Sequence, residues 1–367
     1  MPERVRDISE FELIERLRDA LPPDVRANDE VLLGIGDDAA LWNVPPATVV
    51  LITTDSLIAG VHFRTDWTSW HDLGWKALAV NISDIAAMGG IPALATVSLA
   101  LTGAELVDDL IELYTGMGKI AKREGMVLAG GDIVRAPHDF GIHVTVLGTT
   151  RGHRALRRDG AHPGDVIAVT GTLGASAAGL ALVQLPPDDP RRNAATAPLL
   201  IEAHTHPEPR VQAARLALEH GATAAMDLSD GLFGDLPKIL TASGVDATID
   251  LDAIPVAAAV RALFPDTWLA LATRGGEDYE LLLTLPIDRV ALLQDALESI
   301  GSTLTVIGSI GPRTANPALS ARTRSGETVR IASFNIQVFG QTKAAKPHVM
   351  NILADVVRRF DVVAIQE

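Results

Sequence analysis

The chain has 367 residues, a length that predicts about two domains of ordinary size with a short remainder. Its 31 basic and 46 acidic residues leave a net charge of −15, which argues against nucleic acid as the main partner, because phosphate backbones attract Lys and Arg. Cysteine is absent, so disulfides, thiolate metal sites and cysteine nucleophiles are excluded.

The first 21 residues are charged throughout and predict an amphipathic helix rather than a signal peptide. Ser9 and Glu12 form a capping-box pattern at its start. The most apolar stretch, 77–101, is interrupted by Asn, Asp, Gly and Pro, which a bilayer span does not tolerate, so we expect a cytoplasmic protein. The residues expected to share the apolar face of the first helix are Phe11, Ile14, Leu17 and Leu21.

Apolar runs of strand length alternate with helical patterns over residues 1–150, which predicts an α/β or α+β domain. Glycines stop both expected helices. The expected strands cover 49–53, 95–101, 127–129 and 142–149, and the expected helices cover 72–88 and 106–124.

A basic, glycine-bearing stretch at 151–164 begins a second α/β domain that extends to residue 311. A segment rich in Pro, Asp and Ala, 185–209, predicts a long surface loop within it. The expected strands cover 166–170, 281–285 and 304–310, and the expected helices cover 174–184, 209–220, 229–242 and 289–300. Residues 312–328 then predict a linker, followed by a short strand–helix–strand tail over 329–334, 346–360 and 361–365.

Acidic residues recur beside glycine, serine or threonine at the ends of the apolar runs. Each alone could cap a helix or fill a turn. Together they indicate a ligand site, because α/β folds place ligand sites where strands end. The positions are Asp37, Asp38, Asp55, Asp84, Asp132, Asp227, Asp230, Glu277 and Asp278.

Carboxylates that converge on one site need cations, because two such charges at about 4 Å repel by roughly 4 kcal/mol at an effective dielectric of 20. Oxygen donors without cysteine or a paired-histidine motif favour a hard ion such as Mg²⁺, which a few carboxylates hold together with substrate phosphates. The sequence has no P-loop, kinase glycine-rich loop or dinucleotide-binding fingerprint. We therefore expect any nucleotide to be bound through metal ions.

Six motifs in order give a specific resemblance. Together they resemble the thiamine-monophosphate kinase family of the aminoimidazole-ribonucleotide-synthetase-like superfamily, over about residues 11–311. Each motif is weak alone, but six in order with sensible spacing are strong. The motifs are Gly34–Leu41 (GIGDDAAL), Thr53–Phe63 (TTDSLIAGVHF), Lys76–Gly89 (KALAVNISDIAAMG), Gly130–Asp132 (GGD), Asp227–Leu232 (DLSDGL) and Gly275–Leu281 (GGEDYEL).

The resemblance implies ATP-dependent phosphorylation of thiamine phosphate to thiamine diphosphate. It also implies a homodimer built on the N-terminal domains, with the active site between the two domains. By this resemblance several Mg²⁺ ions would be held by Asp38, Thr53, Thr54, Asp55, Asp84, Asp132, Asp227 and Asp230. ATP would be contacted by Gly131, Asp132, Arg158 and Ser229, and thiamine phosphate by His62 and Glu277.

The expected chemistry needs no strong general base and no covalent phosphoenzyme, because the acceptor is a phosphate oxygen that is already anionic near neutral pH. Catalysis would consist of metal-assisted charge neutralisation and in-line alignment, so no side chain is expected to act as acid, base or nucleophile. Asp37 and Asp278 stand next to assigned residues and are expected either to support those residues or to face solvent.

The C-terminus departs from the family. Thiamine-monophosphate kinases normally end with a Gly-aromatic-x-His-Phe segment that helps close over the thiamine, and this chain lacks it. Residues 329–367 instead resemble the opening of the endonuclease/exonuclease/phosphatase superfamily, in which Asn335 and Glu367 would belong to the metal site. That class also needs His and Asp residues farther downstream, so we interpret 329–367 as an inactive fragment and expect it to pack poorly.

Three alternatives remain open. The chain could be another ATP-using synthetase of the superfamily, although the selenophosphate and hydrogenase-maturation enzymes usually rely on a Cys or selenocysteine that is missing here. It could be a metal-dependent phosphodiesterase that acts through its tail. It could also bind metal and nucleotide without catalysis, since the aromatic closing segment is missing.

Overall fold

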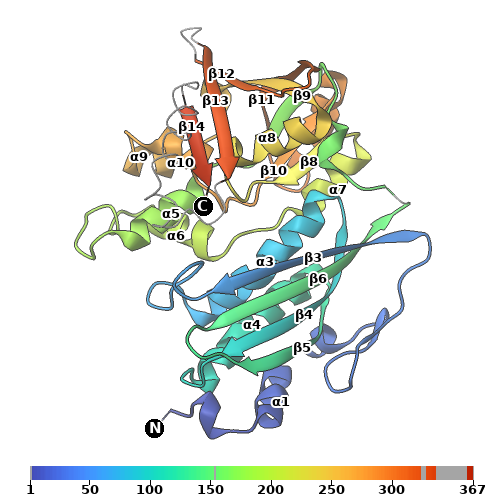
Figure 1. The fold of residues 1–367 in the computed structure, drawn as a ribbon, viewed down its shortest axis with the longest axis vertical. Coiled ribbons are helices and arrows are strands. Elements are labelled where there is room, and N and C mark those ends of the chain that lie inside the picture. Colours follow the sequence, from blue (N-terminus) through green and yellow to red (C-terminus); the bar gives the residue numbers. More distant parts are fainter. Residues whose placement is uncertain (1, 153, 324–327, 336–361, 367) are drawn as a thin grey trace, which may run out of the picture. The chain divides into compact units, whose positions relative to one another are not determined.

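The computed structural model describes residues 2–152, 154–323, 328–335 and 362–366, whose course is drawn in Figure 1. Contacts divide the chain into two compact units. The segment Thr205–Val211 belongs to unit 1, although the chain on either side of it belongs to unit 2. Unit 1 is Met1–Ala155 with Thr205–Val211, and unit 2 is Leu156–His204 with Gln212–Glu367.

A four-stranded sheet in the order β3-β6-β4-β5 forms the centre of unit 1 (Figure 1). β6 pairs antiparallel with β3 and β4, and β5 runs parallel to β4. All four strands were predicted, but each is longer than its apolar run, because polar residues continue the pairing. The strands are β3 (Thr48–Ile58), β4 (Ile91–Leu101), β5 (Val127–Arg135) and β6 (Gly141–Arg151).

Helices α3 (Trp70–Ala87) and α4 (Val107–Glu124) lie against one face of this sheet (Figure 1). Both were predicted, and Gly125, with a φ of 70°, ends α4 as expected. Buried valines and leucines of β6 and β4 point toward these helices. The opposite face carries Val50 and Ile52 of β3, whose side chains are 38% and 68% exposed.

Helix α1 (Glu10–Ala20) starts at the predicted cap, where the Ser9 hydroxyl accepts a backbone N–H of the first turn at 3.2 Å. The predicted apolar face was partly wrong, because Phe11 is 80% exposed. Leu17 and Leu21 are buried as predicted, and Leu13 is buried with them, since residues four apart lie on the same side of a helix. Three short elements follow, α2 (Pro23–Arg26), β1 (Val31–Leu33) and β2 (Leu41–Trp42).

The sheet of unit 2 has eight strands in the order β14-β13-β12-β9-β11-β7-β10-β8. β7 is buried along its whole length and pairs antiparallel with β10 and β11, all three of which were predicted. β8 and β9 were missed, because short mixed runs give no clear alternation. The strands are β7 (Val166–Thr170), β8 (Ala224–Asp227), β9 (Val245–Asp250), β10 (Leu281–Leu285), β11 (Leu304–Arg313), β12 (Leu319–Arg322), β13 (Thr328–Asn335) and β14 (Val362–Gln366).

The expected loop 185–209 contains a helix, α6, so that prediction was wrong. Pro198 lies in the first turn of α6, where its missing N–H costs no intrahelical hydrogen bond. In the described ranges no helix has the length and apolar character needed to cross a membrane. The helices of unit 2 are α5 (Ala175–Gln184), α6 (Ala197–Thr205), α7 (Val211–Glu219), α8 (Leu232–Ser243), α9 (Ala258–Leu263), α10 (Trp268–Arg274) and α11 (Val290–Glu298).

The expected linker 312–328 contains strand β12, which pairs in parallel with β9 and so continues the sheet of unit 2. β13 adds to β12 in antiparallel register, and β14 adds to β13 in parallel register. The two strands predicted for the tail therefore form and extend the sheet at one edge. The expectation that the tail packs poorly stays a prediction. The helix predicted at 346–360 lies outside the described residues.

Trp75 of α3 anchors the segment Thr205–Val211 to unit 1. The His206 ring stacks on Trp75 with 3.8 Å between ring centroids. The Trp75 Nε1–H donates to the Pro207 carbonyl at 2.8 Å, and the Arg123 guanidinium lies 4.6 Å from the Trp75 ring centroid. These aromatic and polar contacts explain why the segment belongs to unit 1.

This anchor is expected to weaken in mild acid. Burial lowers the pKa of His206 below its ordinary 6.5 and His71 lowers it further, although Asp72, with Oδ1 3.3 Å from Nδ1, and Glu208 oppose the shift. Folding therefore favours the neutral ring, and stability is lost as the pH falls through the lowered pKa. The Tm of the wild type should fall more than that of His206→Phe between about pH 7 and about pH 5. Each kcal/mol lost from the free energy of unfolding corresponds to a fall in Tm of about 2–4 °C.

The phenylalanine keeps an aromatic ring on Trp75 but cannot take up a proton. His138→Phe, at an exposed histidine of the same unit, is the matched control and should follow the wild type. Parallel pH curves for wild type and His206→Phe would contradict the interpretation.

Candidate active site

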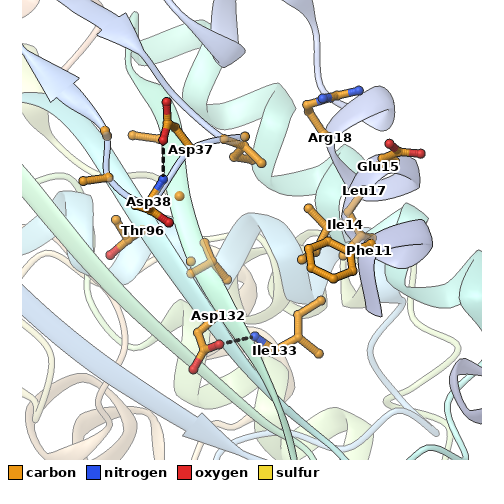
Figure 2. A pocket seen from close by; sticks show the side chains of 18 of the residues that line it. Phe11, Ile14, Glu15, Leu17, Arg18, Asp37, Asp38, Thr96, Asp132 and Ile133 are labelled. Atoms are coloured by element: carbon orange, nitrogen blue, oxygen red, sulfur yellow. Dashed lines mark hydrogen bonds between the residues drawn. The ribbon is translucent and has the colours of Figure 1, made fainter. Parts of the chain in front are cut away.

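A cavity of ≈ 680 Å³ opens in unit 1 beside β5, the edge strand of the sheet (Figure 2). Asp37, Asp38 and Asp132 lie on one side of it, and Phe11 of α1 lies on the other. Tyr114 of α4 also lines the cavity, and burial raises the pKa of its hydroxyl, which keeps it protonated. The cavity thus joins an acidic wall to an aromatic one, and its size suits a nucleotide-sized ligand.

The acidic wall is held by local backbone contacts. Asp37 Oδ1 accepts the N–H of Asp38 at 2.8 Å, and Asp132 Oδ1 accepts the N–H of Ile133 at 2.9 Å. Asp37 therefore supports its neighbour, one of the two roles expected for it. At Gly131 the two parallel strands approach so closely that a Cβ would lie 1.9 Å from the Val97 carbonyl oxygen.

A second group of candidate ligands lies between β3 and α3. Thr53 Oγ1 donates to Asp84 Oδ2 at 2.5 Å. Burial raises the pKa of Asp55, the Asp84 carboxylate raises it further, and His62 acts in the opposite direction. Two carboxylates thus share a half-buried environment that disfavours their negative charge, and a cation would relieve this cost.

Cross-strand register separates Asp55 from Asp132. Asp55 pairs with Val144, Val144 with Val97, and Val97 with Gly131. Paired residues share a face of the sheet and successive residues alternate, so Asp132 lies on the opposite face from Asp55. The two expected ligands are therefore not brought together within this sheet.

Because successive side chains of a strand point to opposite faces of the sheet, the side chains of Thr53 and Thr54 lie on different faces. The Thr145 hydroxyl donates to Thr54 Oγ1 at 3.1 Å, on the face opposite Asp84, so only the backbone of Thr54 is available on the Asp84 side. His62 is exposed, and its Nδ1 accepts the N–H of Ile58 at 3.1 Å. Its ring proton is therefore assigned to Nε2.

The remaining aspartates lie in unit 2 at the turn from β8 to α8. Asp227 ends β8 and is buried. The carboxylate of Asp230 forms an ion pair with Lys238 at 2.5 Å, and Lys238 also binds Asp235 Oδ1 at 2.7 Å. A metal ion at Asp230 would have to compete with Lys238. Helix spacing could have shown that Asp235 and Lys238 share a side of α8, but the sequence analysis missed both.

The segment Gly275–Tyr279 packs against this turn. The N–H of Glu277 donates to the Ser229 carbonyl at 2.9 Å. Glu277 and Tyr279 have φ values of 66° and 50°, in the left-handed region that few side chains adopt. Such outliers are concentrated at functional sites, where surrounding contacts hold them in place.

Asp278 does not line a ligand site but caps α5. Its carboxylate accepts the N–H groups of Gly174 at 2.7 Å and Ser176 at 3.2 Å. Burial raises the pKa of Asp278 to about 7, although these two hydrogen bonds act to lower it. The supporting role expected from the sequence is therefore the one the geometry favours.

The other predicted residues lie farther along the chain. The side chain of Arg158 is exposed at a short helical turn in unit 2. Asn335 ends β13, with its backbone opposite Gln366 of β14, and Glu367 lies outside the described residues. In the described part of the chain, no three acidic or histidine side chains gather closely enough to hold a metal ion. The predicted ligands are therefore divided among the cavity, the β3–α3 group and the β8–α8 turn.

Comparisons with known proteins give the family of the chain. Residues 36–150 match the N-terminal domain, and residues 162–316 the C-terminal domain, of AIR synthase related proteins. The chain is 44% identical over 308 residues to thiamine-monophosphate kinase from Escherichia coli (strain K12), covering 82% of this chain and 90% of that protein.

Solved structures give the same result. The crystal structure of thiamine-monophosphate kinase from Stenotrophomonas maltophilia K279a is 36% identical, with a TM-score of 0.74, covering 87% of this chain and 98% of that one. AaThiL, solved in complex with AMPPCP and TMP, is 29% identical, with a TM-score of 0.68, covering 89% of this chain and 98% of that one. Both family domains end before β12, so the nuclease-like interpretation of 329–367 stays a prediction.

The close approach at Gly131 predicts a sharp difference between two adjacent glycines. Gly131→Ala should lower the free energy of unfolding by about 1–3 kcal/mol, because its Cβ would displace the Val97 carbonyl and disturb the pairing of β4 with β5. Gly130→Ala is the matched control, since its Cβ would meet only Thr96 Cγ2, at 3.9 Å. Urea denaturation measures both, and equal stabilities would contradict the described geometry.

Proposed function

The chain belongs to the thiamine-monophosphate kinase family, and we propose that it transfers the γ-phosphoryl group of ATP to thiamine phosphate, forming thiamine diphosphate and ADP. The observation that carries this proposal is the 44% identity to the E. coli kinase over 308 residues. AaThiL, solved with AMPPCP and TMP, supports the choice of both substrates.

ATP occupies the cavity beside β5 in this proposal. The aromatic surface of Phe11 and Tyr114 suits a base, and the acidic wall suits phosphates that arrive with their cations. Gly131 would offer ATP its backbone at the cavity wall, although the Val97 carbonyl occupies the place that a side chain would fill. Arg158 and Ser229, which belong to unit 2, supply further phosphate contacts.

The donor atoms fit Mg²⁺. Thr53, Asp55 and Asp84 offer hard oxygen donors, and the Asp84 carboxylate raises the pKa of Asp55, a repulsion that a cation would reduce. When bound, Mg²⁺ would supply charge neutralisation for the phosphates. Asp38, Asp132, Asp227 and Asp230 would hold further ions, in competition with the Lys238 ammonium at Asp230.

The reaction is a direct in-line transfer. The acceptor oxygen of thiamine phosphate is already anionic, so the chain needs to orient it rather than deprotonate it. Glu277 and His62 orient thiamine phosphate, and the acidic residues fix the ATP phosphates through their metals. No side chain forms a covalent bond with phosphorus in this proposal.

Two copies of the chain pair through the uncovered face of the four-stranded sheet. Val50 and Ile52 form an exposed apolar stripe on β3, which a second copy would bury. Thr54 and Thr145 add hydroxyls to the same face. The cytoplasmic location expected from the sequence stays a prediction.

Asp84→Asn separates metal binding from folding. The amide oxygen keeps an acceptor for Thr53 Oγ1, and loss of the Asp84 charge removes one cause of the raised pKa of Asp55, so the metal-free variant should still fold cooperatively. The Mg²⁺-dependent rise in Tm should disappear, and kcat/KM should fall about 100-fold.

Asp139→Asn, in the exposed loop before β6, is the control and should behave as wild type. A destabilised Asp84→Asn protein with wild-type kinetics would return Asp84 to a structural role.

Truncation separates the kinase from the nuclease-like tail. Ending the chain after residue 323 keeps β12 on the sheet and removes 324–367. With ATP, Mg²⁺ and thiamine phosphate, full-length and truncated chains should both form thiamine diphosphate, measured by chromatography. The kinase proposal would be contradicted if neither chain formed thiamine diphosphate and the full-length chain showed a phosphodiesterase activity that the truncated chain lacked.

A further inference from the structure

His204 is a buried histidine of unit 2 for which the sequence suggested no role. It lies near the C-terminal end of α6, and its side chain is 7% exposed. Helix α6 packs closely on α5 at Gly179, where a Cβ would lie 2.0 Å from the Leu200 carbonyl oxygen and 3.0 Å from the His204 Cβ. This close packing fixes the ring of His204 against α5.

One nitrogen of the ring faces two partners. Nδ1 lies 3.2 Å from Glu277 Oε2 and 3.2 Å from Ser176 Oγ. An ionised carboxylate can only accept a hydrogen bond, so the proton is assigned to Nδ1, which donates to Glu277. The Ser176 hydroxyl can accept from the same N–H or turn toward another acceptor.

The backbone around Glu277 is held independently of its side chain. The N–H groups of Glu277 and Tyr279 donate to the carbonyls of Ser229 and Leu228 at 2.9 and 3.0 Å. The Asp278 carboxylate is held by the start of α5. Removing the His204 ring would therefore remove one contact that orients the Glu277 carboxylate while leaving its loop in place.

The side chains of Glu277 and His204 differ in exposure, which indicates different roles. The side chain of Glu277 is 34% exposed, so its carboxylate can meet a ligand, whereas His204 is too buried to do so. Thiamine carries a permanent positive charge on its thiazolium ring and an amino group on its pyrimidine, and a carboxylate suits both.

We propose that His204 is a positioning residue that holds the Glu277 carboxylate in the orientation that binds thiamine phosphate. The inference rests on the proposed function, which makes Glu277 a contact of that substrate. It predicts that His204 affects the binding of thiamine phosphate and not the binding of ATP. In the described part of the chain, the polar contacts of the ring include the loop of Glu277 and no residue that lines the ATP cavity.

Two amide variants test the position of the donor. His204→Asn places an N–H close to the position of Nδ1, whereas His204→Gln places it near Nε2, away from Glu277. The asparagine variant should keep the wild-type KM for thiamine phosphate within about threefold. The glutamine variant should raise this KM about tenfold or more, with the KM for ATP unchanged.

A double-mutant cycle tests whether the effect passes through Glu277. In a Glu277→Gln background, His204→Gln should add little to the KM for thiamine phosphate, because the carboxylate that it positions is gone. His220→Asn, at a histidine whose Nδ1 lies 2.9 Å from a carbonyl of its own helix, is the matched control and should leave both KM values unchanged. Calorimetric titration of thiamine phosphate measures the same change without turnover.

The outcomes separate the two proposals. If the wild type forms thiamine diphosphate and His204→Gln keeps the wild-type KM, the role of His204 is overturned and the kinase proposal stands. Equal increases in the KM values for thiamine phosphate and ATP would also overturn the role of His204. So would equal losses in Tm for the asparagine and glutamine variants together with equal KM values for thiamine phosphate, because both results indicate a purely structural effect. If the wild type neither binds nor phosphorylates thiamine phosphate, the proposed function fails and the inference fails with it.

Discussion

The repulsion between carboxylates that the fold holds in place is the constraint on which the candidate site depends. Asp55 and Asp84 share the covered side of a sheet, where burial and each other's charge raise the pKa of Asp55. At Asp230 the chain supplies a cation of its own, the ammonium of Lys238. In the proposed function an external cation would reduce the repulsion at Asp55, and polyphosphate would be bound through such cations.

The two units hold their candidate residues in different ways. In unit 1, rigid elements carry the acids, since β3, α3 and β5 each fix one carboxylate through backbone geometry. In unit 2, the segment Gly275–Tyr279 carries Glu277 in a strained conformation, held by Ser229, by the start of α5 and by His204. Strain held by several neighbours is a means of keeping a ligand contact preorganised.

The sequence predicts the main elements well, because capping residues, glycine stops and apolar runs are local signals. Ser9 and Gly125 mark helix ends as expected, and β7 and β10 have the predicted bounds. Its failures concern long-range packing. Phe11 is exposed because the body of the unit, rather than the cap, decides which side of α1 is buried. The segregation of Asp55 from Asp132 depends on β6 lying between β3 and β4, which no motif reveals.

The most direct test of the account is a ³¹P NMR time course with the chain, ATP, Mg²⁺ and thiamine phosphate. The account predicts that the thiamine phosphate signal is replaced by the two coupled signals of thiamine diphosphate, with one molecule of thiamine diphosphate for each ADP formed. It also predicts that the thiamine phosphate signal persists when EDTA removes the metal. ADP appearing with inorganic phosphate while thiamine phosphate persists would contradict it, as would transfer that proceeds without metal.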